Sequence, residues 1–173
     1  KTTVKLLVGT AYRAPTNTEI YQAPDDVKLK VEKATTYEVN ASYKLSSKFL
    51  LRLNVFHNDL TDAIVLSNLA SPNDDKNPGR FTINGLETRV DMFINKSISG
   101  YANFTYMDGT AKNLLTGLQR QISGIARVKG NIGLLFRKPD FGSIHLSGNW
   151  VGQRSVPRTD PHGPVDGYFL TNI

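Results

Sequence analysis

The residues able to do chemistry are few and scattered along this chain of 173 residues. The three histidines, His57, His145 and His162, share no metal-ligand spacing such as H-x-x-x-H, so each is interpreted as a surface or interior polar residue. The chain has no cysteine, which excludes a disulfide framework, a thiolate metal site and a cysteine nucleophile. The sequence therefore predicts no metal centre.

The remaining candidates for chemistry are carboxylate pairs and glycines. Two acidic pairs, at 25–26 and 74–75, lie among Pro and Asn residues, where carboxylates usually form turns. The glycines follow neither the G-x-G-x-x-G order nor that of a phosphate-binding loop. We expect no catalytic residue and no cofactor, and thus not an enzyme.

Charge and hydropathy narrow the class of protein. The net charge is +6, but the Lys and Arg residues form no basic run or helix, which argues against a nucleic-acid partner. Mean hydropathy is −0.30, and no stretch reaches the roughly 18 consecutive apolar residues that a membrane helix needs. The chain begins directly in strand-like sequence, so no signal peptide is expected.

The elements that must position the charged residues are strands. From Thr35 to Leu45 apolar and polar residues alternate almost without exception, which is the period of a strand with two different faces. The same pattern recurs along the chain and predicts about eight strands and no helix of respectable length. The facing changes at His57-Asn58-Asp59, which predicts a β-bulge, and again at Gly85. One further strand is expected from Ile122 to Phe136.

The connections alternate in length. Long polar connections are expected at 13–33, 67–80, 107–120 and 153–166, and tight turns at 46–47, 97–100 and 138–140. Outer-membrane barrels have this asymmetry, with short periplasmic turns and long extracellular loops. Within that interpretation the first strand runs outward.

The two faces of these strands differ in charge. No Lys, Arg, Asp or Glu falls on the apolar face of the six cleanest strands, as a lipid-facing wall requires. Aromatic residues near the strand ends, from Tyr12 to Tyr168, suit interfacial girdles. Charges of both signs fall on the opposite face and suggest packing against a polar plug: Glu38, Arg52, Glu87, Arg89, Asp91, Arg127 and Lys129. A soluble antiparallel sandwich would show the same alternation, with core against solvent, so the pattern alone leaves both architectures open.

The stretch from Gly9 to Thr16 discriminates between them. It reads G-T-A-Y-R-A-P-T, and acidic and aromatic residues follow at fixed intervals. This resembles the "G-x-A/S-[FY]-R-A-P-[ST]…E-x-[YF]…L-K-P-E…[YF]-E" signature in the barrel domain of TonB-dependent outer-membrane receptors, with Val31 where that family usually has Pro. The segment at 84–87 resembles a second family strand, "N-x-G-x-E". The matching motif residues are Tyr12, Arg13, Ala14, Pro15, Glu19, Glu32 and Glu38.

The resemblance implies an all-β fold: an antiparallel transmembrane barrel fragment, seen here as a curved open sheet. Residues 1–173 would be part of the barrel domain, without the plug domain or the final strands. The family imports scarce ligands such as ferric siderophores, haem, cobalamin or oligosaccharides across the outer membrane of Gram-negative bacteria. The implied partners are outer-membrane lipid, the receptor's own plug, the TonB energy-coupling complex and the ligand. The runner-up is a non-transporting barrel or sandwich module, such as an adhesin.

Ligand contacts are expected in the long connections, which gather on one side of such a barrel. Arginine forks there suit carboxylate or catecholate oxygens, so an anionic iron complex is the favoured ligand. The expected ligand-binding residues are Arg154, Arg158, His162, Asp74, Asp75 and Lys76.

Overall fold

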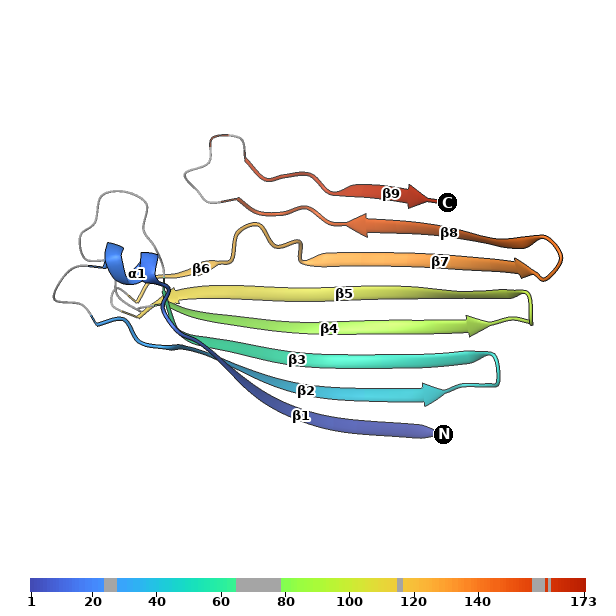
Figure 1. Cartoon of the computed structure of the whole chain (residues 1–173), viewed down its shortest axis with the longest axis horizontal. Helices are drawn as coiled ribbons and strands as arrows, with labels where there is room; N and C mark the ends of the chain where they lie inside the picture. Colours follow the sequence, from blue (N-terminus) through green and yellow to red (C-terminus); the bar gives the residue numbers. More distant parts are fainter. Residues whose placement is uncertain (24–27, 65–78, 115–116, 157–160, 162) are drawn as a thin grey trace.

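The computed structural model describes residues 1–23, 28–64, 79–114, 117–156, 161 and 163–173. These residues form one antiparallel sheet and a single short helix (Figure 1). No described helix is long and apolar enough to cross a membrane. The sheet is open, and its strand order is β1-β2-β3-β4-β5-β7-β8-β9, with the short β6 paired to β5. The predicted open sheet of about eight strands is confirmed.

Each strand follows a stretch of alternating sequence, and neighbouring strands pair antiparallel along most of their length. In chain order the elements are β1 (Thr2–Arg13), α1 (Asn17–Gln22), β2 (Glu32–Lys44), β3 (Phe49–Ala63), β4 (Gly79–Phe93), β5 (Ile98–Asn113), β6 (Gln119–Gln121), β7 (Val128–Lys138), β8 (Gly142–Val151) and β9 (Tyr168–Asn172).

The strand register places residues of similar polarity next to one another across the sheet. Lys5, Asn40, Asn54 and Glu87 are consecutive partners from β1 to β4, and we call the side on which they lie the polar face. Because side chains alternate along a strand, the residues between them point the other way. We call that side the apolar face; its rows include Leu6, Val39, Val55, Leu86, Tyr106 and Val128.

No second layer of described residues covers the apolar face. Val39, Leu53 and Ile132 are 45%, 37% and 54% exposed, and only Ala63 and Ala126 are buried apolar residues among those described. The sandwich alternative is therefore wrong for this chain, because a sandwich would bury these side chains between two sheets.

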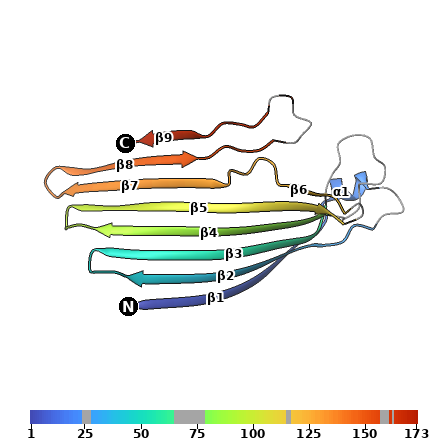
Figure 2. The same ribbon diagram turned by 180° about the vertical axis from the view of Figure 1, so that it is seen from behind.

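The two ends of the sheet differ, as the loop lengths predict. Short turns at 45–48, 94–97 and 139–141 lie at one end, the turn end, together with both chain termini (Figures 1 and 2). Side chains stabilise these turns: Asn95 Oδ1 accepts hydrogen bonds from the backbone N–H groups of Ser97 and Ile98 at 2.8 and 2.9 Å. Helix α1 lies at the opposite end, the α1 end.

The predicted bulge lies elsewhere. Pairing continues without a break through His57-Asn58-Asp59, and the register shifts between Leu60 and Ala63 instead. Asp62 there has φ 53°, a left-handed conformation that Asp tolerates better than most residues. The predicted phase change at Gly85 is also wrong, because Gly85 is in register with Phe56 and leaves room for its ring.

Both wrong predictions have one physical cause: the polarity of the faces reverses toward the α1 end. Beyond Tyr37 and Val55, the outward positions of β3 and β4 are polar, and Asp59 and Arg80 form an ion pair at 2.7 Å. On the other side the same stretch carries half-buried apolar residues, namely Phe56, Leu60, Phe81 and Ile83. The sequence pattern shifts by one residue although the backbone does not.

The same reversal lengthens β5, which runs to Asn113 through residues expected to be a long polar connection. The strand expected from Ile122 to Phe136 is broken, because Gly124 has φ +80° and β7 begins only at Val128. In β9, Phe169 pairs with Trp150 on the apolar face, whereas Tyr168 pairs with Val151 and does not join the aromatic girdle.

Candidate functional site

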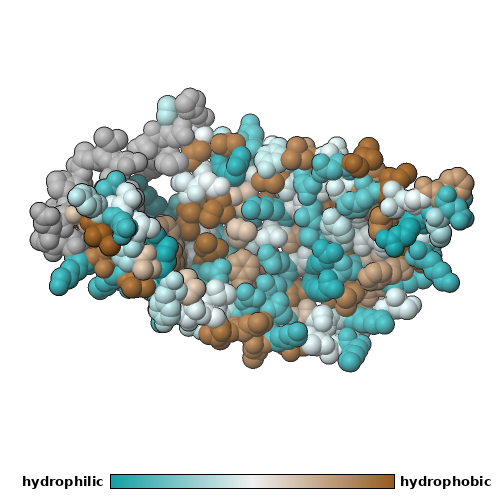
Figure 3. All heavy atoms as spheres, in the orientation of Figure 1, coloured by the Kyte–Doolittle hydropathy of each residue, from teal (hydrophilic) through white to brown (hydrophobic). Residues whose placement is uncertain are grey.

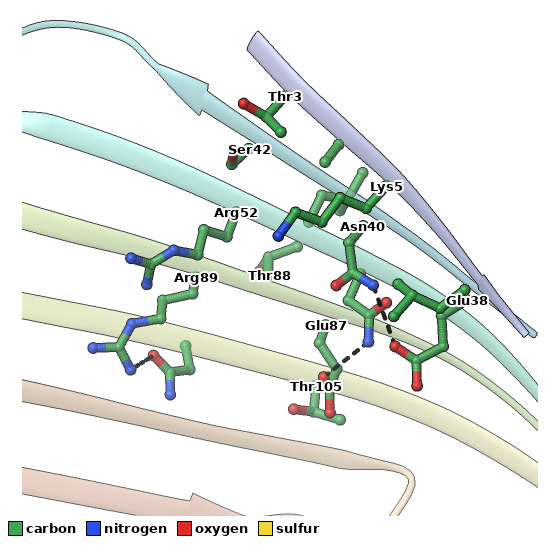
Figure 4. A pocket seen from close by; sticks show the side chains of 15 residues that line it. Thr3, Lys5, Glu38, Asn40, Ser42, Arg52, Glu87, Thr88, Arg89 and Thr105 are labelled. Carbon is green, nitrogen blue, oxygen red and sulfur yellow. Dashed lines mark hydrogen bonds between the residues drawn. The ribbon is translucent and has the colours of Figure 1, made fainter. Parts of the chain in front are cut away.

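A hollow of about 680 Å³ lies on the polar face. Strands β1 to β5 all contribute to it, so it forms only when residues 3 to 105 are brought together. The middle of the strands is largely hydrophilic in Figure 3. The hollow shows that the polar face is the concave side. Its charged lining residues are Lys5, Glu38, Arg52, Glu87 and Arg89 (Figure 4).

The cationic part of the hollow is organised by one carboxylate. Asp91 is 7% exposed, and it lies 2.7 Å from Arg52 Nη1 and 2.7 Å from Arg89 Nε. Arg52 and Arg89 are direct cross-strand partners, an arrangement that is destabilising without an anion between them. Arg89 also lies over the ring of Tyr101, 4.6 Å from its centroid. These contacts hold both guanidinium groups in fixed positions.

The acidic part lies nearer the α1 end. Glu38 accepts a hydrogen bond from the Asn40 amide at 3.2 Å, and Glu87 accepts one from Asn54 at 3.4 Å. Neither carboxylate forms a salt bridge to a described residue. Both therefore keep acceptor capacity for a further partner.

Two of the residues predicted to face the interior lie farther along the sheet. Lys129 pairs with Thr105 and Val151, in the same cross-strand row as Glu87. Arg127 precedes β7, and its guanidinium is 2.7 Å from Asp108 in β5. Of the seven residues predicted to face the interior, four line the hollow and Asp91 contacts two of these four. Arg127 and Lys129 lie outside it.

A second cluster forms at the α1 end around Arg13, the last residue of β1. Its guanidinium donates to both oxygens of Glu19, at 2.9 and 3.1 Å, and its Nε donates to Glu32. Glu32 in turn accepts from the backbone N–H of Ile64 at 2.7 Å. One arginine therefore ties the first connection to the ends of β1, β2 and β3.

Glu19 also starts helix α1. Thr16 and Glu19 form a capping box, in which the Thr16 N–H donates to Glu19 at 2.7 Å and the Glu19 N–H donates back to the Thr16 hydroxyl at 3.3 Å. The hydrogen bonds from Arg13, aided by that of Thr16, lower the pKa of Glu19 to about 2. Sequence reasoning missed this helix, although the T-x-x-E spacing signals it.

The other motif residues do not join this cluster. Tyr12 is on the apolar face and 69% exposed, Glu38 lies in the hollow, and Ala14 and Pro15 follow the end of β1. Pro15 precedes the N-cap of α1, and the strand stops there as predicted.

Most of the expected ligand-binding residues cannot be placed. Asp74, Asp75, Lys76, Arg158 and His162 lie outside the described residues. Arg154 is described: its backbone pairs with Ala126 and Val165, and its guanidinium carbon is 5.9 Å from the ring centroid of Tyr168. It is half-buried rather than a free loop charge. Among the described residues no group of three or more His, Asp or Glu side chains could hold a metal ion.

Solved structures share this fold at low sequence identity. The copper transporter OprC matches with a TM-score of 0.75 and 19% identity, over 98% of this chain and 27% of its own. The FrpB iron transporter from Neisseria meningitidis matches with a TM-score of 0.73 and 14% identity, over 98% of this chain and 29% of its own. The ferric-catecholate import receptor Fiu from K12 E. coli matches with a TM-score of 0.73 and 16% identity, over 98% and 26%. This chain thus spans between a quarter and a third of their lengths.

Comparison with known sequences gave a family match but no match to an individual curated protein. No curated protein matches the chain. The model of the family described as "TonB dependent receptor-like, beta-barrel" matches residues 2–173. Because that match covers nearly the whole chain, the chain belongs to the TonB-dependent receptor β-barrel family.

Proposed function

We propose that this chain is part of the wall of an outer-membrane receptor that imports a ferric siderophore or similar iron complex by TonB-dependent energy coupling. The observation that carries the proposal is the family match together with the opposed faces of the sheet. Several structural neighbours are named for iron cargoes: an iron transporter, a ferric-catecholate import receptor and a ferric yersiniabactin uptake receptor. One neighbour is a copper transporter, so a copper complex is the competing cargo.

The apolar face supports a position in lipid. On β7 its outward residues run from Val128 to Phe136, nine residues. At about 3.3 Å per residue and a tilt of about 40°, this stretch spans roughly 20 Å of bilayer, near the height of the apolar band in such barrels. From Val128 to Phe136 no charged residue lies on the outward side of β7 or among its outward partners on β5 and β8. The reversal of polarity near Tyr37 and His57 would mark where the wall leaves the hydrocarbon.

The polar face supports a filled interior. A concave surface with charges of both signs suits a polar domain inside the barrel better than an open basic channel. By analogy with the family, that domain is the plug on which the TonB complex pulls. Glu38 and Glu87, each bonded to one Asn amide, would accept donors from it with their remaining capacity.

The α1 end would then be extracellular. Helix α1 lies at this end, where β1, β3 and β5 end and the long connections leave the sheet, and the Arg13 cluster fixes the described part of the first connection. Ligand capture by Arg154 and Arg158 is proposed because guanidinium forks bind carboxylate and catecholate oxygens in pairs.

The proposal is tested by uptake in a strain that expresses the full-length receptor and lacks its other iron receptors. We expect uptake of at least one radiolabelled ferric siderophore from a panel, abolished when TonB is deleted. The Arg154→Ala/Arg158→Ala variant should bind that complex more weakly at unchanged receptor abundance. His145→Ala, on the polar face of β8, is the matched control. Uptake of copper complexes but of no iron complex would refute iron as the cargo. Uptake without TonB would refute TonB-dependent energy coupling.

A further inference from the structure

The turn end of the sheet carries positive charge that the described residues do not neutralise. Five cations lie in or beside the three short turns, where Asp140 is the only acidic residue, and we call them the turn-end cations: Lys44, Lys48, Lys96, Arg137 and Lys138. All five are exposed, and none forms a salt bridge with a described residue. At the α1 end, by contrast, Arg13, Arg80 and Arg127 are each paired with a carboxylate.

The turn-end cations recur at regular intervals along one edge of the sheet. The three turns join β2 to β3, β4 to β5 and β7 to β8, and β5 is the neighbour of β7, so each turn lies two strands from the next (Figure 1). Because neighbouring strands are about 4.8 Å apart, the turns are roughly 10 Å apart and the charge is spread over about 20 Å.

Lys138 lies at the border between this charge and the apolar face. It pairs with Gly142, two residues beyond the outward pair of Phe136 and Ile144, so it lies on the outward side of β7. Its amine is 4.2 Å from the ring centroid of Phe141, and that residue is 81% exposed. A basic group over an exposed aromatic ring suits the boundary of a bilayer, where the ring meets hydrocarbon and the amine meets phosphate groups.

This arrangement fits a lipid leaflet better than a small anion or a protein. A single phosphate or carboxylate ion could reach the cations of one turn but not of all three. A leaflet that contains anionic lipids presents many phosphate groups in one plane, and it attracts basic residues close to its surface. An acidic protein surface would match the charge but would offer no hydrocarbon to Phe141.

We propose that the turn-end cations bind the phosphodiester groups of anionic phospholipids, with Phe141 at the edge of the hydrocarbon. The inference rests on the proposed function, because the orientation given there places the turn end at the periplasmic leaflet of the outer membrane. This binding adds an electrostatic contact to the apolar one and selects among the lipids around the wall.

Competition between two lipids tests the contact. Purified full-length receptor in nonionic detergent is mixed with equal amounts of phosphatidylglycerol and phosphatidylcholine that have the same acyl chains, and the bound lipids are counted by native mass spectrometry. We expect the wild type to retain more phosphatidylglycerol. In the Lys96→Gln/Arg137→Gln/Lys138→Gln variant the ratio of the two lipids should fall at least fivefold, since each cation near an anionic surface contributes about fivefold in affinity.

Two matched variants show whether position and charge both matter. Lys33→Gln/Lys112→Gln/Arg120→Gln removes three exposed cations at the α1 end and should leave the ratio unchanged. Lys96→Arg/Arg137→Lys/Lys138→Arg keeps the charge of the turns and should also keep the ratio. The same five variants and wild-type samples are checked for unfolding in vesicles, so that a loss of lipid in a folded receptor is attributed to the substituted side chains.

Three results would overturn the inference. These are a wild-type ratio of one, an equal fall in the α1-end variant, and complete displacement of phosphatidylglycerol by glycerol phosphate at constant ionic strength, which would identify a small soluble anion as the ligand. Failure of the proposed function is distinguishable, because lipid retention requires neither cargo nor TonB. Absent iron uptake would refute that function whatever the ratio, and an unchanged ratio in the turn-end variant of a receptor that imports normally would refute this inference alone.

Discussion

Replacing Ile132 with arginine should destabilise the receptor far more than placing arginine on the opposite face. Ile132 is the central outward residue of β7, midway between Val128 and Phe136, and it is 54% exposed in this sheet. An arginine at the midplane of a membrane barrel costs about 2–4 kcal/mol, and near the interface about 0–1 kcal/mol. We therefore expect Ile132→Arg to lower the free energy of unfolding by about 3 kcal/mol and Phe136→Arg by less than about 1 kcal/mol.

The matched control is His145→Arg on the polar face of β8. His145 is exposed and pairs with Leu135, so an arginine there should change the free energy of unfolding by no more than about 0.5 kcal/mol. The assay is guanidinium unfolding of the full-length receptor in phospholipid vesicles. The reasoning would be refuted if the three variants were equally stable, or if His145→Arg were the most damaging.

Three further outcomes follow from individual contacts. Gly85→Ala would place a Cβ 2.1 Å from Phe56 Cζ, so it should lower the free energy of unfolding by about 1–3 kcal/mol in the same assay. Adding Phe56→Leu should recover part of that loss, and no recovery would contradict the packing of Phe56 against Gly85. Arg13→Ala should speed chymotrypsin cleavage after Tyr21, which is 94% exposed on α1, whereas Arg13→Lys should retain partial protection; unchanged rates would remove Arg13 as the anchor. Because the pKa of Glu19 is lowered from 4.5 to about 2, its anchoring is complete above about pH 4.5 and is lost as the pH falls toward 2, which hydrogen exchange in α1 should report; pH-independent exchange would count against it.

The fold was largely predictable because its main determinant is local. Period-2 alternation reads directly from the sequence, and the faces follow from it, so Val39 and Leu53 were assigned to one side and Glu38 and Arg52 to the other. The Ser46-Ser47 pair predicted the first short connection for the same reason, whereas the second lies at 94–97, a few residues before the predicted 97–100.

The predicted bulge and phase change were wrong because the polarity of the two faces reverses there, whereas the strand geometry continues. Near the α1 end the outward side carries polar residues and the inward side packs apolar residues, so Asp59 and Phe81 imitate a phase shift. A single sequence cannot distinguish this reversal from a bulge, because both exchange the polarity of alternate positions. The extended β5 was missed for the same reason.

The sequence predicted which residues belong to the site, but not how they contact one another. Arg52, Arg89 and Asp91 were all expected on one face, yet their common contact depends on the register of β3 against β4. The motif likewise named Arg13, Glu19 and Glu32 without indicating that they touch, since 19 residues separate the first from the last. Helix α1 was missed because six residues carry no periodic signal, and only its capping box gives it away.

The orientation of the wall in the membrane tests the central claim most directly. Because the described chain has no cysteine, Ser47→Cys in the first short turn and Tyr21→Cys on α1 introduce single reactive thiols into it. Intact cells expressing either variant of the full-length receptor are treated with a membrane-impermeant maleimide. We predict that Tyr21→Cys is labelled from outside and that Ser47→Cys is labelled only after the outer membrane is opened. Labelling of Ser47→Cys on intact cells, with Tyr21→Cys protected, would contradict the account.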